Sequence, residues 1–361
     1  MSLSIGIVGF PNVGKSTLFN ALLKKQVALA ANYPFATIEP NVGVAEVPDN
    51  RLTKLAGVVK TTVIKPAIVE FTDIAGLVKG AHKGEGLGNK FLAHIRETSA
   101  IAHVLRNFTD QSVLREGTTT PKEDLANIRM ELQLADLETL SKQKEPKGRA
   151  DKEDIERWGA IEKLRFILES GKNVIFSLEE LEKNVIEVAD DLCLLTAKPE
   201  IFVINIDEIE LKNQTKIIEQ YSKELEIDKK QIVVVSAQIE SELATLTIED
   251  QKLYMEDLGI ERSGLERLAE VAYETLNLQS FLTAGEKEVR AWTIKKGTTA
   301  SQAAGVIHTD FMKKFIKAKV VKYSDFIATN GWNGAREQGK IRVEGRDYVM
   351  RADDVVEFMI G

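Results

Sequence analysis

The chain has 361 residues, more than one ordinary domain holds, so we expect two or three domains. Its composition, 43% hydrophobic and 29% charged, is that of a globular protein, and its net charge of −7 argues against a protein that coats nucleic acid by bulk charge. No apolar run reaches the roughly 20 residues that span a bilayer, no signal peptide is recognisable, and the single cysteine, Cys193, excludes an intramolecular disulfide. We therefore expect a cytoplasmic protein that makes no membrane contact.

Short apolar runs, rich in β-branched residues, alternate with helical periods along most of the chain before residue 280. The first run, 4–9, ends in glycine and is followed by a helical period over 15–25. Buried strands that are separated by helices are typical of a mostly parallel sheet in an α/β fold. The predicted strands are 4–9, 42–47, 67–71, 101–108, 201–204 and 232–235.

The alternation stops between residues 120 and 198, where two charged helical segments follow one another. Thr120 and Pro121 form a typical helix start, and Pro146 breaks the chain before a second helical period over 151–169. The apolar stripe of each segment is narrow. The pattern predicts an antiparallel helical hairpin, inserted between two strands, that projects as a coiled-coil arm.

The last part of the chain, from about residue 278, is a small strand-rich α+β module. It contains strand candidates at 292–294, 319–321, 341–343 and 355–358, and helix candidates at 300–304 and 310–319. Residues 281–361 hold 14 basic and 10 acidic residues, a net charge of +4, so this module is more basic than the rest. Its lysines cluster at Lys313, Lys314, Lys317, Lys319 and Lys322.

These observations divide the chain into three expected domains. A nucleotide-binding domain would comprise 1–119 and 199–277, the helical insertion 120–198, and the carboxyl-terminal module 278–361.

The segment Gly9–Ser16 matches the P-loop pattern G-x-x-x-x-G-K-[ST], and it lies between a predicted strand and a predicted helix. In such a loop, backbone N–H groups converge on phosphate oxygens, Lys15 reaches the β- and γ-phosphates, and the Ser16 hydroxyl binds Mg²⁺. The helix amino terminus adds a favourable dipole. The expected nucleotide-binding residues here are Asn12, Val13, Gly14, Lys15, Ser16 and Thr17.

Two further positions are expected to respond to the γ-phosphate. Asp73 and Gly76 fit the D-x-x-G motif of GTPase-type P-loop proteins, in which the aspartate holds Mg²⁺ through water and the glycine amide senses the γ-phosphate. Thr37 lies in the loop before the second strand, where such proteins place another Mg²⁺ ligand. We therefore expect Ser16, Thr37 and Asp73 to surround the metal, and Lys15 and Gly76 to stabilise the reacting phosphate.

The group that activates the attacking water is not evident. Many such enzymes carry glutamine directly after D-x-x-G, but Leu77 stands here and cannot form a hydrogen bond. The next segment, 80–88, contains four glycines and His82. His82 is a candidate general base, and a solvated side chain in this loop is an equally good interpretation of it. We expect slow intrinsic hydrolysis.

The base-recognition segment Asn205–Glu208 departs from the N-K-x-D motif of guanine-specific proteins. Ile206 replaces the lysine that covers the base, and Glu208 is one methylene longer than the usual aspartate. Asn205 could bond the amine and ring nitrogen of adenine, although Glu208 could still serve guanine through a shifted loop. The remaining candidate residues around the base are Phe108, Ser236 and Ala237.

Taken together, these motifs resemble the YchF/Obg-like ATPases, a branch of the Obg group of P-loop proteins, over essentially the whole chain. The resemblance implies a P-loop domain, a coiled-coil arm and a TGS-like carboxyl-terminal domain. It also implies ATP preferred over GTP, Mg²⁺ as cofactor, and binding to the ribosome. By the same resemblance, Asn12 contacts a monovalent cation such as K⁺ and Asn205 contacts adenine, whereas Asn107 departs from the small residue that is usual before Phe108.

We therefore expect an ATP-hydrolysing switch with ATP and ADP as ligands, in which the arm or the carboxyl-terminal domain contacts the ribosome or RNA. We expect it to be a monomer. One alternative is a GTPase of the same architecture. Another is a nucleotide-gated RNA or ribosome adaptor whose hydrolysis is incidental.

Overall fold

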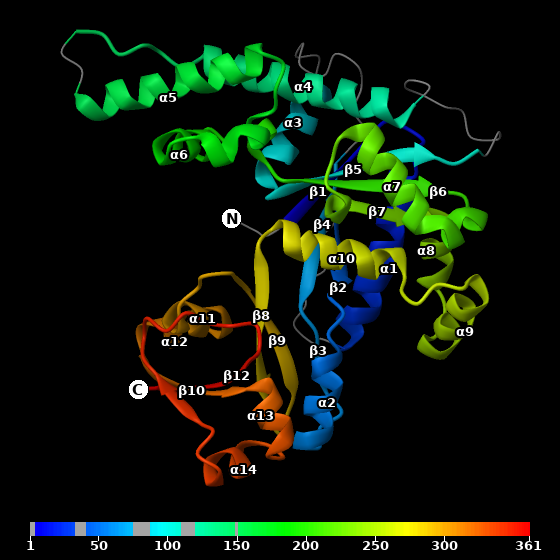
Figure 1. Cartoon of the computed structure of the whole chain (residues 1–361), viewed down its shortest axis with the longest axis vertical. Helices are drawn as coiled ribbons and strands as arrows, with labels where there is room; N and C mark the ends of the chain where they lie inside the picture. The colour runs from blue at the N-terminus through cyan, green and yellow to red at the C-terminus, as the bar shows by residue number, and fades with distance from the viewer. Residues whose placement is uncertain (1–3, 33–40, 75–86, 110–119, 149–150) are drawn as a thin grey trace. The chain divides into compact units, whose positions relative to one another are not determined.

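The computed structural model describes residues 4–32, 41–74, 87–109, 120–148 and 151–361. The chain forms two compact units (Figure 1). The first comprises residues 1–44 and 70–271, and the second comprises residues 45–69 and 272–361. Within the described ranges, no helix is both long and apolar enough to cross a membrane.

A six-stranded sheet in the order β2-β4-β1-β5-β6-β7 forms the centre of the first unit. The pairs β1–β4, β1–β5, β5–β6 and β6–β7 are all parallel, as the alternation of strands and helices predicts. The strand bounds are β1 (Ser4–Val8), β2 (Val42–Glu46), β4 (Ile68–Asp73), β5 (Ala100–Asn107), β6 (Glu200–Ile206) and β7 (Ile232–Val235).

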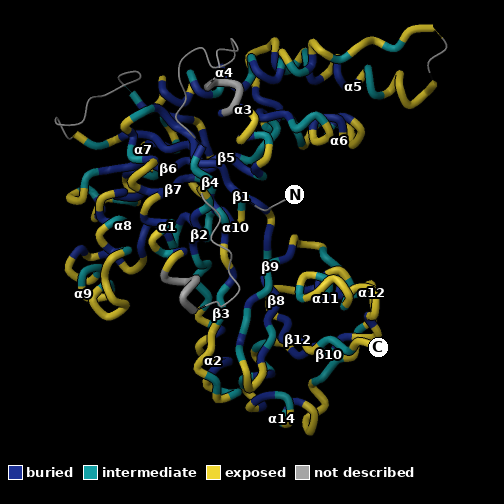
Figure 2. The backbone as a smooth tube through the Cα atoms, turned by 180° about the vertical axis from the view of Figure 1, so that it is seen from behind, coloured by how far each residue is buried: buried dark blue, intermediate teal, exposed yellow. Residues whose placement is uncertain are grey.

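Helices pack on this sheet, and Figure 2 shows buried strands between helices with exposed outer turns. Close packing requires Gly6 in the central strand β1, because a Cβ there would lie 2.5 Å from the Cδ1 atom of Ile74. The bounds of these helices are α1 (Lys15–Asn32), α3 (Leu87–Glu97), α7 (Gln214–Leu225), α8 (Ala237–Leu243), α9 (Ile248–Leu258) and α10 (Gly264–Thr275). Two 3₁₀ helices, η4 (Glu208–Asn213) and η5 (Lys229–Gln231), flank α7.

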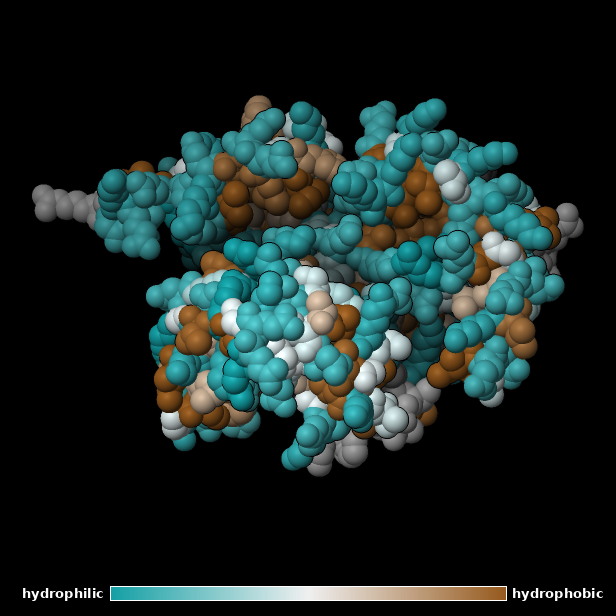
Figure 3. Space-filling view, turned by 60° about the horizontal axis from the view of Figure 1, so that its bottom comes forward, coloured by the Kyte–Doolittle hydropathy of each residue, from teal (hydrophilic) through white to brown (hydrophobic). Residues whose placement is uncertain are grey.

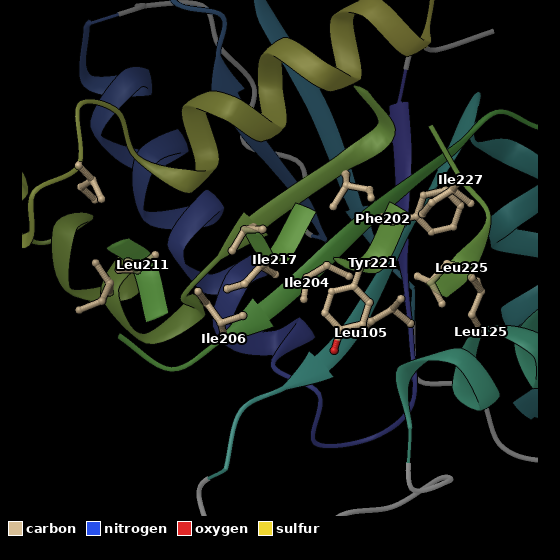
Figure 4. Close-up of a cluster of buried hydrophobic side chains, with 14 of the residues drawn as sticks. Leu105, Leu125, Phe202, Ile204, Ile206, Leu211, Ile217, Tyr221, Leu225 and Ile227 are labelled. Atoms are coloured by element: carbon tan, nitrogen blue, oxygen red, sulfur yellow. The ribbon is translucent and has the colours of Figure 1, made fainter. Parts of the chain in front are cut away.

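On one side of the sheet, apolar residues of β5, β6 and β7 pack against α7 and its flanking turns (Figure 4). Phe202, Ile204 and Val234 from the strands are buried with Tyr221 and Leu225 from α7. Each fully buried side chain of this size contributes about 1.5–3 kcal/mol relative to an exposed one. The cluster therefore holds the carboxyl ends of β5 and β6 in place.

The insertion consists of α4 (Pro121–Ser141), α5 (Lys152–Glu169), η2 (Val174–Glu180), α6 (Lys183–Asp191) and η3 (Leu195–Ala197). Figure 1 shows α4 running out and α5 running back, as the hairpin prediction requires. Thr120 caps α4, its hydroxyl accepting the Glu123 N–H, and the Asp151 carboxylate caps α5 in the same way. The helix α6, which the sequence pattern does not predict, packs on α5 and gives the insertion a hydrophobic core of its own.

The second unit contains a mixed sheet in the order β11-β10-β12-β8-β9-β3. Its strands are β3 (Ile64–Lys65), β8 (Leu278–Ala284), β9 (Val289–Lys295), β10 (Phe315–Lys322), β11 (Arg342–Glu344) and β12 (Asp354–Ile360). Its helices are α2 (Asn50–Val59), α11 (Ala300–Ile307), α12 (Thr309–Lys313), α13 (Tyr323–Ala328) and α14 (Trp332–Glu337). Residues 45–69, which the sequence places in the nucleotide-binding domain, thus supply β3 and α2 to this unit.

The predicted helix over 310–319 is wrong in its second half. The helix α12 ends at Lys313, and the strand β10 begins at Phe315 and pairs with β11 and β12. The reason is the β-branched content after Phe315, which favours a half-buried strand with Ala318 and Val320 turned to the core. The clustered lysines therefore lie on a helix end and a strand, not on one helix face.

Hydrophilic residues cover much of the face drawn in Figure 3, where they border hydrophobic patches.

Candidate nucleotide-binding site

The P-loop connects β1 to α1 at the carboxyl edge of the parallel sheet, the edge at which ligands bind in open α/β sheets. Its two glycines are required by close contacts. A Cβ at Gly9 would lie 2.6 Å from the Val104 carbonyl oxygen, and a Cβ at Gly14, whose φ is +99°, would overlap Nδ2 of Asn205. The backbone of the loop therefore packs against β5 and β6 without room for larger residues.

Asn205, near the end of β6, holds the loop from the other side. Its Nδ2 donates to the Val13 carbonyl at 2.9 Å, and its Oδ1 accepts the Ala237 N–H, also at 2.9 Å. The side chain is only 5% exposed. An amide has two N–H donors and an oxygen with two lone pairs, so one donor and one acceptor position remain for a base. The structure thus brings Val13, Asn205 and Ala237 together.

Lys15 and Asp73 form the charged part of the site. The Lys15 ammonium is buried and donates to the Phe10 carbonyl at 2.6 Å. Burial lowers the pKa of Lys15 to about 8, although the Asp73 carboxylate opposes this shift. Burial likewise raises the pKa of Asp73, and Lys15 opposes it. Because each charge is incompletely compensated, a phosphate with Mg²⁺ would stabilise both.

The first turn of α1 offers the remaining phosphate-side groups. Ser16 and Thr17 are exposed in this turn, and no acidic residue of the turn competes for the helix amino terminus. Asn12 is also exposed and adopts a left-handed conformation, with φ of +60°. The predicted residues Thr37, Gly76 and His82 lie outside the described residues.

The predicted base-side residues lie at the ends of β5, β6 and β7. Phe108 is half-buried, with the Arg106 guanidinium 4.2 Å from its ring centre, and Glu208 is exposed at the start of η4. Ser236 is buried before α8. Ile206, in contrast, is 2% exposed and belongs to the hydrophobic cluster (Figure 4), so its side chain packs the core, and a role at the base stays a prediction.

One contact at this edge is not evident from the motifs. The Asp207 carboxylate accepts hydrogen bonds from the N–H and the hydroxyl of Thr109, which joins the loops after β5 and β6. The only signal in the sequence is an aspartate before a helix, which predicts a cap of that helix and not a bond to a residue 98 positions away.

Comparisons with known proteins agree on one family. A family model described as "50S ribosome-binding GTPase" matches residues 4–146, and a model for the carboxyl-terminal region of YchF GTPases, described as a protein of unknown function, matches residues 278–361. The ribosome-binding ATPases YchF of Bacillus subtilis and Escherichia coli O157:H7 are each 46% identical to the chain, with 99% of both proteins aligned.

A solved structure, the YchF GTPase of Schizosaccharomyces pombe, has a TM-score of 0.86 at 36% identity and covers 99% of this chain and 98% of its own. The predicted P-loop α/β fold with a carboxyl-terminal domain is therefore confirmed. The extent of the match and the level of identity lead to a plain conclusion: the chain belongs to the YchF family.

Proposed function

We propose that the protein is a nucleotide-dependent switch that binds ATP in preference to GTP, hydrolyses it to ADP and phosphate, and associates with the ribosome. The names of the bacterial relatives, which are ribosome-binding ATPases, support both parts of this proposal. The geometry of the P-loop, with its buried lysine and closely packed glycines, supports binding of a nucleoside triphosphate.

The observation that carries the choice of base is Glu208. It stands one residue after Asp207, at the carboxyl edge of the sheet, where guanine-specific proteins place an aspartate. Guanine needs two hydrogen bonds to one carboxylate in the plane of the base, and a side chain longer by one methylene does not reach the same position. The free donor and acceptor positions of Asn205 suit the amine and ring nitrogen of adenine.

On the phosphate side, Lys15 would contact the β- and γ-phosphates, and Ser16 and Asp73 would hold Mg²⁺. The donor set fits this ion, because Mg²⁺ prefers oxygen ligands and is usually bound by one or two protein groups together with phosphates and water. Bound Mg²⁺ would neutralise charge that develops on the phosphate oxygens. Thr37, Gly76 and His82 stay candidates for the same site, and Asn12 for a K⁺ ion.

A GTPase of the same architecture is the second candidate. The Schizosaccharomyces pombe relative and the family model that matches residues 4–146 both carry the word GTPase in their names. In that case Glu208 would bind guanine through a shift of its loop.

Calorimetric titration of ATP and GTP separates the two candidates, because comparable or tighter binding of GTP would contradict the adenine preference. The variant Glu208→Asp should shift the preference toward GTP, and Glu210→Asp, on the same 3₁₀ helix, serves as the matched control. Restoring a lysine at Ile206 is a poorer test, since it would bury an ammonium group in the hydrophobic cluster.

Ribosome association is tested by co-sedimentation with purified ribosomes in ADP, in ATP and in a non-hydrolysable ATP analogue. We expect binding to depend on the nucleotide, and Lys15→Ala to abolish this dependence. Equal binding in every nucleotide state would favour an adaptor whose hydrolysis is incidental.

A further inference from the structure

The loops that follow β5 and β6 are joined by one side chain. The Asp207 carboxylate accepts a hydrogen bond from the Thr109 N–H at 3.0 Å and another from the Thr109 hydroxyl at 2.9 Å. The backbone ladder between the two strands ends just before this point, at the pair Asn107–Ile206. The Asp207 side chain therefore continues the connection between the strands beyond their last backbone pair.

The Asp207 carboxylate does not cap the helix that it precedes. Asp207 occupies the N-cap position of η4, where an aspartate ordinarily accepts N–H groups of its own helix, yet in this described segment its side chain makes no such cap bond. Its carboxylate is turned across to Thr109 instead. Hydrogen bonds to an ionised carboxylate are stronger than neutral ones, so the contact can hold the two loops at a set distance.

Each of the joined loops carries a residue that the sequence motifs predict at the base. Phe108 directly precedes Thr109, and Glu208 directly follows Asp207. The Phe108 ring is held on its own side by the Arg106 guanidinium, 4.2 Å from the ring centre. A base bound at the ends of β5 and β6 would therefore meet two groups whose spacing depends on the contact between Asp207 and Thr109.

We propose that Asp207 is a positioning residue for base selection: its hold on Thr109 sets the spacing between Phe108 and Glu208, and with it the fit of adenine relative to guanine. The inference rests on the proposed ATP binding. Recognition by paired hydrogen bonds is lost steeply when the partners are displaced, because polar groups are then left unpaired. The phosphate-side residues Lys15 and Asp73 are not part of this contact, so the chemical step should not depend on it.

The test compares Asp207→Ala, Thr109→Val and Thr109→Ser by calorimetric affinities for ATP and GTP and by kcat at saturating ATP. Asp207→Ala loses both hydrogen bonds and should reduce the ATP-to-GTP affinity ratio by about tenfold, and Thr109→Val, which keeps its N–H, by about threefold. Thr109→Ser keeps both donors and should retain the wild-type ratio. We expect kcat at saturating ATP to stay within about twofold of wild type.

Asp228→Ala is the matched control, because Asp228 also precedes a 3₁₀ helix but caps it by accepting the Lys230 N–H. Its affinity ratio should not change. An unchanged ratio in Asp207→Ala, or an equal loss of ATP and GTP affinity accompanied by a lower melting temperature, would overturn the inference. If Asp207→Ala does not fold, the comparison of Thr109→Val with Thr109→Ser decides alone. A wild-type protein that fails to bind ATP would contradict the proposed function and not this contact.

Discussion

The Glu200 carboxylate on β6 receives two hydrogen bonds from the Arg129 guanidinium on α4, at 2.6 and 3.2 Å. His103 on β5 lies against the same carboxylate at 3.1 Å. Burial by itself would raise the pKa of Glu200, but the hydrogen bonds and charges of His103 and Arg129 outweigh it and lower the pKa to about 2. A buried ion pair therefore attaches the helical insertion to the sheet.

Breaking this ion pair should destabilise the protein. Glu200→Gln leaves Arg129 without its counter-charge, so the free energy of unfolding should fall by about 3 kcal/mol at pH 7. Because the folded pKa of about 2 lies below the ordinary value of 4.5, the contribution of Glu200 is present above pH 4.5 and is lost as the pH falls toward 2. Urea unfolding of the wild type and of Glu200→Gln measures the difference in the free energy of unfolding, at each pH at which both proteins are folded in the absence of urea.

Glu182→Gln is the control for this prediction, because Glu182 pairs with Lys163 at the surface, where both side chains are more than half exposed. Such pairs contribute about 0–1 kcal/mol. A loss in Glu200→Gln no larger than that in the control would contradict the role of the buried pair.

Binding of a nucleoside triphosphate should be linked to protonation of Lys15. With its pKa lowered to about 8 by burial, Lys15 is partly neutral in the free protein above that pH, whereas phosphates favour the charged form. The affinity for ATP should therefore be nearly constant well below pH 8 and fall as the pH rises through 8, with net uptake of a proton on binding. Calorimetry at pH 8.5 in buffers of different ionisation enthalpy detects this uptake, and its absence would show that Lys15 stays charged in the free protein.

Gly14→Ala should disable the P-loop. The added Cβ would overlap Nδ2 of Asn205 at a backbone φ of +99°, so the loop or the Asn205 side chain must move. We expect at least a tenfold loss of ATP affinity. Gly57→Ala, where a Cβ meets nothing within 4 Å in the helix α2, should leave the affinity unchanged and raise stability by up to about 1 kcal/mol.

The exposed lysines Lys313, Lys314 and Lys317 predict an electrostatic contact with RNA in the ribosome. Replacing all three with glutamine should weaken co-sedimentation and reduce the slope of log affinity against log salt concentration by about two. Replacing Lys216, Lys230 and Lys252, three exposed lysines of the first unit outside the insertion, with glutamine tests whether any equal loss of charge has the same effect. Equal losses in both variants would point to a non-specific contribution.

The parts that could be predicted from the sequence are those with local causes. The P-loop is recognisable because its glycines, lysine and serine stand at fixed spacing within one short segment. The strands β1, β5, β6 and β7 are recognisable because continuous apolar runs favour buried strands. The family resemblance, drawn from the same motifs, is confirmed by full-length relatives.

The parts that were missed depend on distant partners. The strand β8 contains the polar residues Gln279, Ser280 and Thr283, so its alternation of apolar and polar residues is weak. The strand β3 consists of two residues, which form a strand because they pair with β9. The bond between Asp207 and Thr109 likewise joins loops far apart in the sequence. Such contacts are set by the sheet order, which no local pattern reveals.

The membership of residues 45–69 in the second unit has a consequence for synthesis and for dissection of the protein. Ile64 and Lys65 pair with Val289 and Arg290, so the edge of the second sheet is completed by a segment made more than 200 residues earlier. During translation β3 cannot pair with β9 until the last quarter of the chain has been synthesised. A fragment cut at residue 278 would leave β9 with an unpaired edge, so the carboxyl-terminal region is better expressed with residues 45–69 joined to it than alone.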